Sequence, residues 1–340
     1  MAPRPHVPRR IDPRTVGLAV ALALAVAALL HPTWTSRVAR HDLTVVVDIT
    51  TSMMVRDASI EGRPASRLDA AKRGLTDLIA RIACGSRVAL AVFSERRAFL
   101  LFEPVEVCSG YPAIAGTLDR LDWRMAWEGD SRISKGVADA LEVAGSLDTD
   151  LVFVTDGHEA PPLRPDQPLW FPGGDGDAKR HGLLVGVGGD ALSPIPKFDD
   201  DGHEVGFLAE SDVPQDNRQG PPPSNAESRT GYNARNAPFG AEVARGNEHL
   251  SSLKQDYLED LGRVTGLGYA RLGRDDLAGA VARFARALPA NAAADLRPLF
   301  GLAAFAALVL VYLVAPLAAV TVRRRRRGAP RSIASRGAPA

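Results

Sequence analysis

Leu43-Thr44-Val45-Val46-Val47-Asp48-Ile49-Thr50-Thr51-Ser52 is the stretch that decides the fold of this chain. Residues 43–47 are apolar and rich in valine, which is typical of a short strand buried on both faces of a parallel sheet. A second run of this kind spans residues 151–154, and Asp156 follows it two residues later. Each of the two expected strands therefore brings one aspartate, Asp48 or Asp156, to its carboxyl end.

Oxygen-bearing side chains surround these two aspartates. Asp48, Thr50 and Ser52 alternate along the turn after the first strand, so their side chains can converge on one side. Ser131 precedes an expected helix and adds another hydroxyl. In an open α/β sheet, ligands bind at the carboxyl ends of the strands, where the strand order reverses. We therefore expect a metal site at this solvated sheet edge, formed by Asp48, Thr50, Ser52, Ser131 and Asp156.

Carboxylate and hydroxyl oxygens suit Mg²⁺, or another hard divalent cation such as Ca²⁺ or Mn²⁺. A simpler interpretation stays open at this point. Thr50, Ser52 and Ser131 could only cap helices, and Asp156 could only form a turn.

The rest of the pattern alternates strands with helices, which favours a doubly wound α/β domain with a mainly parallel sheet and helices on both faces. Further strands are expected at residues 87–93, 98–102, 183–187 and 268–272, and helices at 66–83, 111–121, 133–147, 250–261 and 277–288. Residues 189–248 form a long insertion. Within it, Asp199-Asp200-Asp201-Gly202 is expected to be the turn of a hairpin.

The chain has two cysteines, Cys84 and Cys108. Cys84 precedes the strand at 87–93 and Cys108 follows the strand at 98–102. Antiparallel pairing of these strands would bring the two cysteines together, and a cysteine pair in an exported domain is more often bridged than free. We therefore expect a Cys84–Cys108 disulfide.

Charge is distributed unevenly along the 340 residues, although the whole chain carries only +1. Residues 1–14 carry +3 and residues 323–340 carry +7, which leaves −9 on the segment between them. An acidic middle disfavours binding to nucleic-acid phosphates. The basic ends flank apolar segments, and residues 298–322 hold no charge, which is long enough for a transmembrane helix. Five arginines follow it at once, so both basic tails are expected in the cytoplasm.

Residues 15–34 form the second apolar segment, if it continues as far as Trp34, a residue suited to a membrane interface. It is expected to be an N-terminal membrane anchor. The alternative is a cleaved signal peptide, because Ala25-Val26-Ala27 could serve as a cleavage motif. Both interpretations export the middle of the chain.

The motif set Asp48, Thr50, Ser52, Ser131 and Asp156 resembles the metal-ion-dependent adhesion site (MIDAS) of the von Willebrand factor A (VWA) domain. The resemblance covers residues 42–288. Thr50 stands where that family more often has serine, and Ser131 where it more often has threonine, but both keep a hydroxyl. The resemblance implies that the bound metal accepts a carboxylate from an Asp or Glu of a protein partner.

The flanking segments make the chain similar to bacterial membrane-anchored VWA proteins, and this similarity implies a bacterial inner-membrane protein whose VWA domain lies in the periplasm. Gly186-Val187-Gly188-Gly189 and the hairpin near Ile195-Pro196-Lys197-Phe198 look like the methanol-oxidation-operon proteins of the MxaL/MxaC type. That similarity implies a role in maturing a periplasmic quinoprotein, the methanol dehydrogenase that contains calcium and pyrroloquinoline quinone. The alternative is a Bat-type adaptor in an envelope-stress or MoxR AAA-ATPase-associated complex.

Catalysis is not expected. Phosphate-transferring hydrolases that use an aspartate after the first strand commonly place a second carboxylate two residues later, whereas this chain has Thr50 there. The sequence also lacks a zinc-protease H-E-x-x-H string, a G-x-S-x-G elbow and a P-loop. His158, beside Asp156, is expected to be solvated.

Overall fold

The structure is a computed structural model, and it describes residues 12–126, 129–164, 171, 180–241 and 245–314. Proximity of Cα atoms divides the chain into two compact units. The larger unit is Val38–Ala290, and the smaller one joins Met1–Arg37 with Asn291–Ala340. All five candidate metal ligands belong to the larger unit.

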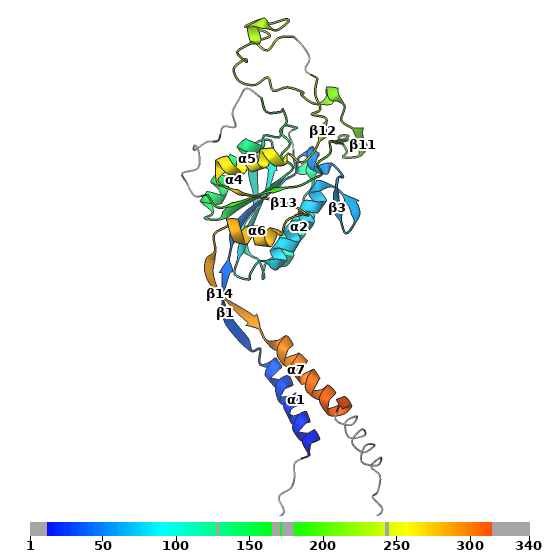
Figure 1. Cartoon of the computed structure of the whole chain (residues 1–340), viewed down its shortest axis with the longest axis vertical. Helices are drawn as coiled ribbons and strands as arrows, with labels where there is room; N and C mark the ends of the chain where they lie inside the picture. Colours follow the sequence, from blue (N-terminus) through cyan, green and yellow to red (C-terminus); the bar gives the residue numbers. More distant parts are fainter. Residues whose placement is uncertain (1–11, 127–128, 165–170, 172–179, 242–244, 315–340) are drawn as a thin grey trace, which may run out of the picture. The chain divides into compact units, whose positions relative to one another are not determined.

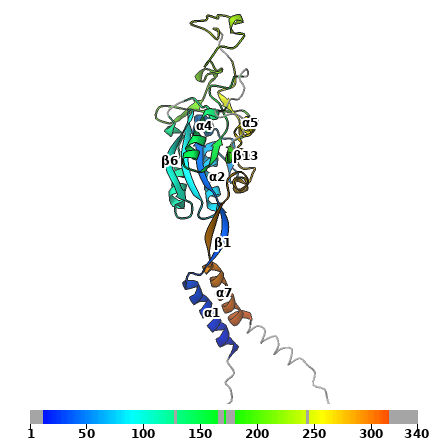
Figure 2. The ribbon, with the colours of Figure 1, turned by 90° about the vertical axis from the view of Figure 1, so that its left-hand side faces the viewer.

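A six-stranded sheet forms the centre of the larger unit (Figure 1). Its strand order is β13 (Gly268–Arg271), β8 (Gly182–Gly186), β7 (Asp150–Thr155), β2 (Asp42–Asp48), β5 (Arg87–Ser94) and β6 (Arg97–Glu106). Neighbouring strands are parallel except for β6, which pairs antiparallel with β5. Figure 2 shows β6 and β13 at the two edges. The expected mainly parallel sheet is confirmed.

Helices cover both faces of this sheet because its central strands are apolar on both sides. Val45 and Val47 pack into one core with α2 (Arg67–Arg81), α3 (Tyr111–Asp119) and α6 (Leu277–Phe284). Val46 points the other way, into a core with α4 (Ile133–Ser146) and α5 (Gln255–Thr265). Figure 1 shows α2 and α6 on one side of the sheet and α4 and α5 on the other.

The strand order reverses beside β2, and this places the candidate site. From β2 the chain crosses through α2 to β5 on one side, whereas β7, β8 and β13 lie on the other side. The carboxyl ends of β2 and β7 therefore meet at the switch point of the sheet, where α/β proteins bind ligands. Asp48 is the last residue of β2, and Asp156 follows the last residue of β7.

The cysteines form the expected bridge at the open end of the β5–β6 hairpin. Cys84 and Cys108 are disulfide-bonded, with their Cα atoms 5.4 Å apart. The carboxylate of Glu106 lies beside the bridge and accepts hydrogen bonds from the backbone N–H groups of Gly85, Cys108 and Ser109, at 2.8, 3.1 and 2.7 Å. These donors stabilise the ionised carboxylate and lower the pKa of Glu106 to about 2.

The insertion is held at its base by two short strands. β9 (Ser193–Pro194) pairs antiparallel with β12 (Leu250–Ser251). Further out, β10 (Pro196–Phe198) and β11 (Glu204–Phe207) form the expected hairpin. Its turn is closed by Asp199 Oδ1, which accepts from the backbone N–H groups of Asp201 and His203.

Two expected helices have different bounds. The helix expected at 250–261 is wrong at its start, because Leu253 N donates to Gly189 O and Lys254 N to Asp156 O, and these bonds keep the segment extended. α5 therefore begins at Gln255 and ends at Thr265, before Gly266 in a left-handed conformation with φ 77°. The helix expected at 277–288 ends at Phe284, where Ala285 turns extended, and residues from Leu288 onward belong to a strand.

The smaller unit contains two helices, α1 (Pro13–Leu29) and α7 (Arg297–Val309), the second continued by a π-helical turn at Leu310–Val314. They pack closely, because a Cβ on Gly17 would lie 2.3 Å from Val311 Cγ2. The chain also contains a two-stranded sheet of β1 (Thr33–Arg40) and β14 (Leu288–Asp295), which the sequence pattern did not reveal.

The apolar segments differ from the expected spans. α1 ends at Leu29 because His31 adopts φ 52° and Pro32 follows it, so Trp34 lies in β1 rather than at the end of a helix. Residues 315–322 of the expected C-terminal span lie outside the described residues. Across the described part of the chain, no helix combines the length and the apolar character needed to cross a membrane.

Candidate metal centre

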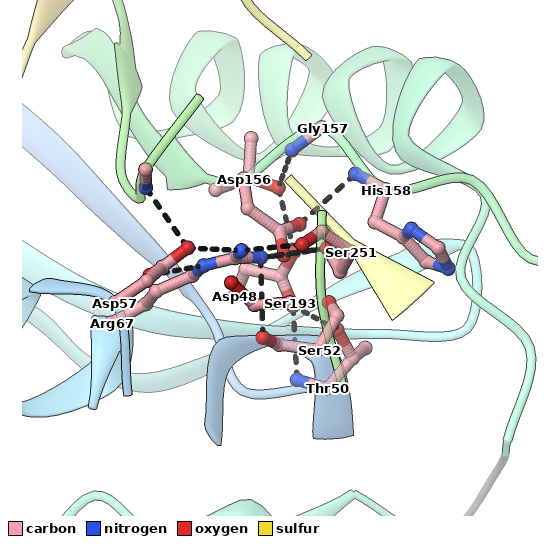
Figure 3. Close-up of polar contacts among 12 residues, drawn as sticks. Asp48, Thr50, Ser52, Asp57, Arg67, Asp156, Gly157, His158, Ser193 and Ser251 are labelled. Carbon is pink, nitrogen blue, oxygen red and sulfur yellow. Dashed lines mark hydrogen bonds and ion pairs between the residues drawn. The ribbon is translucent and has the colours of Figure 1, made fainter. Parts of the chain in front are cut away.

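Three of the expected ligands converge at the end of β2 (Figure 3). Thr50 donates to Asp48 Oδ1 from its backbone N–H at 2.9 Å and from its hydroxyl at 2.7 Å. The hydroxyls of Thr50 and Ser52 lie 3.3 Å apart. The alternation seen in the sequence therefore places a carboxylate and two hydroxyls on one side of the turn.

Asp156 is tied to the same cluster through its neighbour. Thr155, the last residue of β7, donates its hydroxyl to Asp48 Oδ2 at 2.6 Å. Asp156 Oδ1 accepts the backbone N–H of His158 at 2.9 Å, and its Oδ2 accepts from Arg67 Nη1 and, at 3.2 Å, from the hydroxyl of Ser251. Both carboxylates therefore sit at fixed positions across the switch point of the sheet.

Ser131 is held at this end of the sheet by its backbone. Ser131 and Ala160 exchange two backbone hydrogen bonds of 2.7 Å, and Arg132 N donates to Glu95 O, just past β5, at 2.6 Å. The Ser131 hydroxyl is buried and has no hydrogen-bond partner. An unpaired buried hydroxyl is unfavourable, so its oxygen is available to a bound cation.

The site is buried, which corrects the expectation of a solvated edge. Asp48 and Asp156 are fully buried, and Thr50, Ser52 and Ser131 are at most 6% exposed. The set offers only oxygen atoms, from two carboxylates and three hydroxyls, and such a donor set suits a hard divalent cation. The residues present therefore fit the metal that the sequence predicted.

The pKa values of the two carboxyl groups are shifted in opposite directions. Burial and the nearby charge of Asp156 raise the pKa of Asp48 to about 7. Burial also raises the pKa of Asp156, but the guanidinium of Arg67, together with the backbone N–H of His158 and the hydroxyl of Ser52, outweighs burial and holds that pKa below its usual value. Asp48 therefore lacks a cationic partner among the described residues, whereas Asp156 has one.

Arg67 is the residue that sequence reasoning missed. It is fully buried, and its guanidinium contacts Asp156, Asp57 and Ser251. One signal could have revealed it. A cation at the first position of a helix is unfavourable beside the positive end of the helix dipole, and Arg67 precedes Ala71 and Leu75 on the buried face of α2.

Glu159 was also missed as a structural member of the site. Arg132, at the start of α4, gives no side-chain cap, and Glu159 Oε1 instead accepts the backbone N–H of Ser134 at 3.0 Å. The hydroxyl of Tyr257 donates to the same oxygen. Burial raises the pKa of Glu159. This side chain fixes the helix that begins directly after the Ser131 loop.

His158 does not behave as expected. Its side chain is 4% exposed rather than solvated, and Figure 3 shows the ring turned away from Arg67 and Asp57. Burial lowers the pKa of His158, so the ring is neutral at pH 7. Within the described residues, metal-ligating side chains also cluster at Cys84, Glu106 and Cys108, where the thiols are bridged, and at the exposed hairpin turn of Asp199, Asp201 and His203.

No model of a known protein family matches the chain, and no curated protein matches it. Among solved structures, the chain is similar to an aerotolerance-related membrane protein of Bacteroides fragilis carrying multiple mutations to serine. That match has 16% identity, covers 72% of this chain and 96% of the other, and has a TM-score of 0.41.

Two further similar structures have lower scores. One is a von Willebrand factor type A protein of Catenulispora acidiphila. That match has 14% identity, covers 46% of this chain and 40% of the other, and has a TM-score of 0.29. The other is proximal thread matrix protein 1 of the mussel byssus with zinc in its MIDAS motif. That match has 14% identity, covers 45% of this chain and 39% of the other, and has a TM-score of 0.31. At these values the likeness is one of general fold, and the site rests on the contacts of this chain.

Proposed function

We propose that Asp48, Thr50, Ser52, Ser131 and Asp156 hold one divalent cation, with Mg²⁺ as the first candidate and Ca²⁺ or Mn²⁺ as alternatives. The observation that carries the proposal is the buried Ser131 hydroxyl without a partner. It lies in a loop held to both sides of the switch point, where the other four residues meet. A cation would satisfy this oxygen and would also favour the ionised form of Asp48.

The bound cation serves to capture a protein partner rather than to catalyse a reaction. The two ligand carboxylates together balance the charge of a divalent cation, and the guanidinium of Arg67, beside Asp156, adds a further positive charge. The occupied site therefore keeps a surplus of positive charge, and the cation can accept a carboxylate from an Asp or Glu of the partner. Thr50, in the position where a hydrolase commonly has its second carboxylate, leaves no evident group for proton transfer.

The chain is proposed to hold this domain at the bacterial inner membrane. The support is the sequence pattern, in which residues 15–34 and 298–322 are apolar and lie next to basic tails at 1–14 and 323–340. In that arrangement the domain at 42–288 faces the periplasm and both tails face the cytoplasm.

The finer proposal concerns the partner. The strings that resemble methanol-oxidation-operon proteins favour a periplasmic quinoprotein dehydrogenase or its assembly factors, with calcium insertion or assembly as the step assisted. The Bat-type adaptor in an envelope-stress or MoxR-associated complex stays the alternative. Genes for a dehydrogenase large subunit and its cytochrome beside the gene for this chain would favour the first.

Ser131→Ala tests the cation site directly. The change removes an unpaired buried hydroxyl, so the metal-free protein should be as stable as the wild type or more so. Its dissociation constant for Mg²⁺, measured by calorimetry on the full-length protein, should rise at least about tenfold. Ser94→Ala is the matched control, because its hydroxyl is also buried without a partner but is not in the candidate set. Wild-type Mg²⁺ affinity in Ser131→Ala would contradict the proposal.

A further inference from the structure

Both ends of the insertion are fastened to one ion pair, formed by the buried Arg67 and the partly buried Asp57. Where the chain leaves the sheet, Gly189 N donates to Asp57 Oδ2 at 2.9 Å. Where it returns, Ser251 O accepts from Arg67 Nη2 at 3.1 Å. Asp57 and Arg67 are themselves joined by two hydrogen bonds of 2.9 and 2.6 Å (Figure 3). We call the segments at Gly189 and at Ser251 the roots of the insertion.

The same guanidinium reaches into the metal centre. Arg67 Nη1 contacts Asp156 Oδ2 and lies 2.7 Å from the Ser251 hydroxyl, which also contacts Asp156. The fit is close, because a Cβ on Gly188 would lie 2.6 Å from Arg67 Nε. Gly188 has φ 125°, a conformation that favours glycine. Arg67 thus contacts Asp156, an expected metal ligand, and it also contacts Asp57 at the first root and Ser251 at the second.

We propose that Arg67 is a positioning residue that competes with the bound cation for Asp156 and thereby couples metal occupancy to the roots of the insertion. The proposal rests on the cation site described above. Without metal, Arg67 supplies the counter-charge of Asp156 and fastens Ser251. With metal, the cation takes over the charge of Asp156 and repels the guanidinium, and the contacts at the roots loosen.

Reciprocity gives this proposal an expectation that a merely structural arginine would not meet. If the cation weakens the hold of Arg67 on Asp156, then Arg67 must weaken the binding of the cation by the same factor. Removing the charge of Arg67 should therefore strengthen Mg²⁺ binding. An arginine that only braces the site would weaken Mg²⁺ binding when removed.

Arg271 offers a matched control. Its Nη1 contacts Asp190 Oδ1 at 2.6 Å and its Nη2 contacts Gly188 O at 2.9 Å, so it also fastens the first root. The hydrogen bonds of its guanidinium reach Asp190, Gln255 and Gly188 rather than Asp156. Arg271→Met should therefore loosen that root without changing the affinity for Mg²⁺.

The test measures Mg²⁺ affinity by calorimetry and amide hydrogen exchange on the full-length protein and on Arg67→Met, Arg67→Lys and Arg271→Met. The reporting amides are those of Gly189, Leu253 and Lys254, with the amides of β2 as the internal reference. Saturating Mg²⁺ should speed exchange at the roots several-fold in the wild type while slowing it or leaving it unchanged in β2. Arg67→Met should bind Mg²⁺ about tenfold more tightly and lose the Mg²⁺-dependent change at the roots.

The two controls separate charge from geometry. Arg67→Lys keeps the charge but not the fork of donors, so its Mg²⁺ affinity should stay within about threefold of the wild type while its roots exchange faster. Arg271→Met should keep both the affinity and the Mg²⁺-dependent change. If Arg67→Met does not fold, the hydrogen-exchange experiment on the wild type still tests whether Mg²⁺ loosens the roots.

Unchanged or slower exchange at the roots with Mg²⁺ bound would overturn the coupling and leave the cation site standing. Equal or weaker Mg²⁺ binding by folded Arg67→Met would overturn the competition. Absence of any Mg²⁺ binding by the wild type would instead remove the proposed function on which the coupling depends.

Discussion

The two central strands carry a buried aspartate at each end, and the two ends differ. At the amino ends, Asp42 accepts from Arg87 Nη2 at 2.6 Å, and Asp150 accepts from Arg286 Nε at 2.7 Å. At the carboxyl ends, Asp156 is paired with Arg67, whereas Asp48 has no arginine or lysine partner among the described residues. Buried carboxylates with their own arginine hold the fold, whereas a buried carboxylate without one leaves room for an external cation.

The largest expected effect comes from removing both carboxylates at the carboxyl ends. Asp48→Ala with Asp156→Ala should abolish Mg²⁺-dependent capture of the partner. If the partner is the periplasmic quinoprotein dehydrogenase proposed above, the dehydrogenase of a methanol-growing host should still be made and exported but should lack calcium and activity. The measurements are the calcium content and the specific activity of the purified dehydrogenase.

Full dehydrogenase activity in that double mutant would show that docking through a metal does not serve the maturation of the dehydrogenase. Lost activity with normal calcium would keep the docking and would move its role from metal insertion to assembly. Asp150→Asn in the same host is the control at the other end of the sheet, and it should leave capture intact.

Asp150→Asn should instead lower stability. The change leaves Arg286 facing a neutral amide, and the exposure of about a third of the Arg286 side chain limits the loss. We expect the free energy of unfolding to fall by about 2 kcal/mol, as measured by urea denaturation. A gain in stability would mean that the amino-end pairs are not structural, and the comparison would fail.

Asp48→Asn should raise the free energy of unfolding, whereas Asp150→Asn should lower it. The pKa of Asp48 is about 7 in the folded protein, against 3.8 for an ordinary aspartate. Its ionisation therefore opposes folding, and the stability present below about pH 4 is lost as the pH rises through about 7. At pH 8 without metal, Asp48→Asn should be more stable than the wild type by about 1–2 kcal/mol.

That advantage should shrink as the pH falls from about 7 and disappear below about pH 4. Saturating Mg²⁺ should stabilise the wild type and not the variant, as seen in thermal unfolding with and without the metal. A variant that is less stable than the wild type at pH 8 without metal would show that the Asp48 carboxylate supports the fold.

The smallest effect is expected near the disulfide. The pKa of Glu106 is lowered to about 2, so its ionised form stabilises the fold above about pH 4.5, and this contribution is lost as the pH falls toward 2. Glu106→Gln should lower the free energy of unfolding by about 1 kcal/mol at pH 7 and by nearly nothing at pH 2. A difference that did not depend on pH would mean that packing, not charge, explains the effect.

The sequence predicted what local pattern and strand ends determine. Val45, Val46 and Val47 showed a strand buried on both faces, and the polar residues directly after it showed a ligand site at its end. The disulfide followed from the hairpin between the two cysteines. These features depend on residues close in sequence or on the general geometry of parallel sheets, so one chain was enough to find them.

The remaining features depend on contacts between distant residues. Arg67 contacts Asp156 and Ser251, and no local pattern records that these three residues meet. The periodicity at 250–261 favoured a helix, but tertiary hydrogen bonds at Leu253 and Lys254 kept its first turn extended. The burial of Asp48 likewise reflects how several loops fold over the sheet edge.

The closeness of β9 and β12 has a consequence for how such chains diversify. Pro194 faces Leu250 across a single antiparallel register, so the loop between them begins and ends at one place. Closing a loop costs only ~0.6 kcal/mol more for each doubling of its length. Recombination could therefore exchange this loop for one of another length with little thermodynamic penalty, as long as Ser251 is retained, and each exchange would present a different recognition surface on an unaltered scaffold.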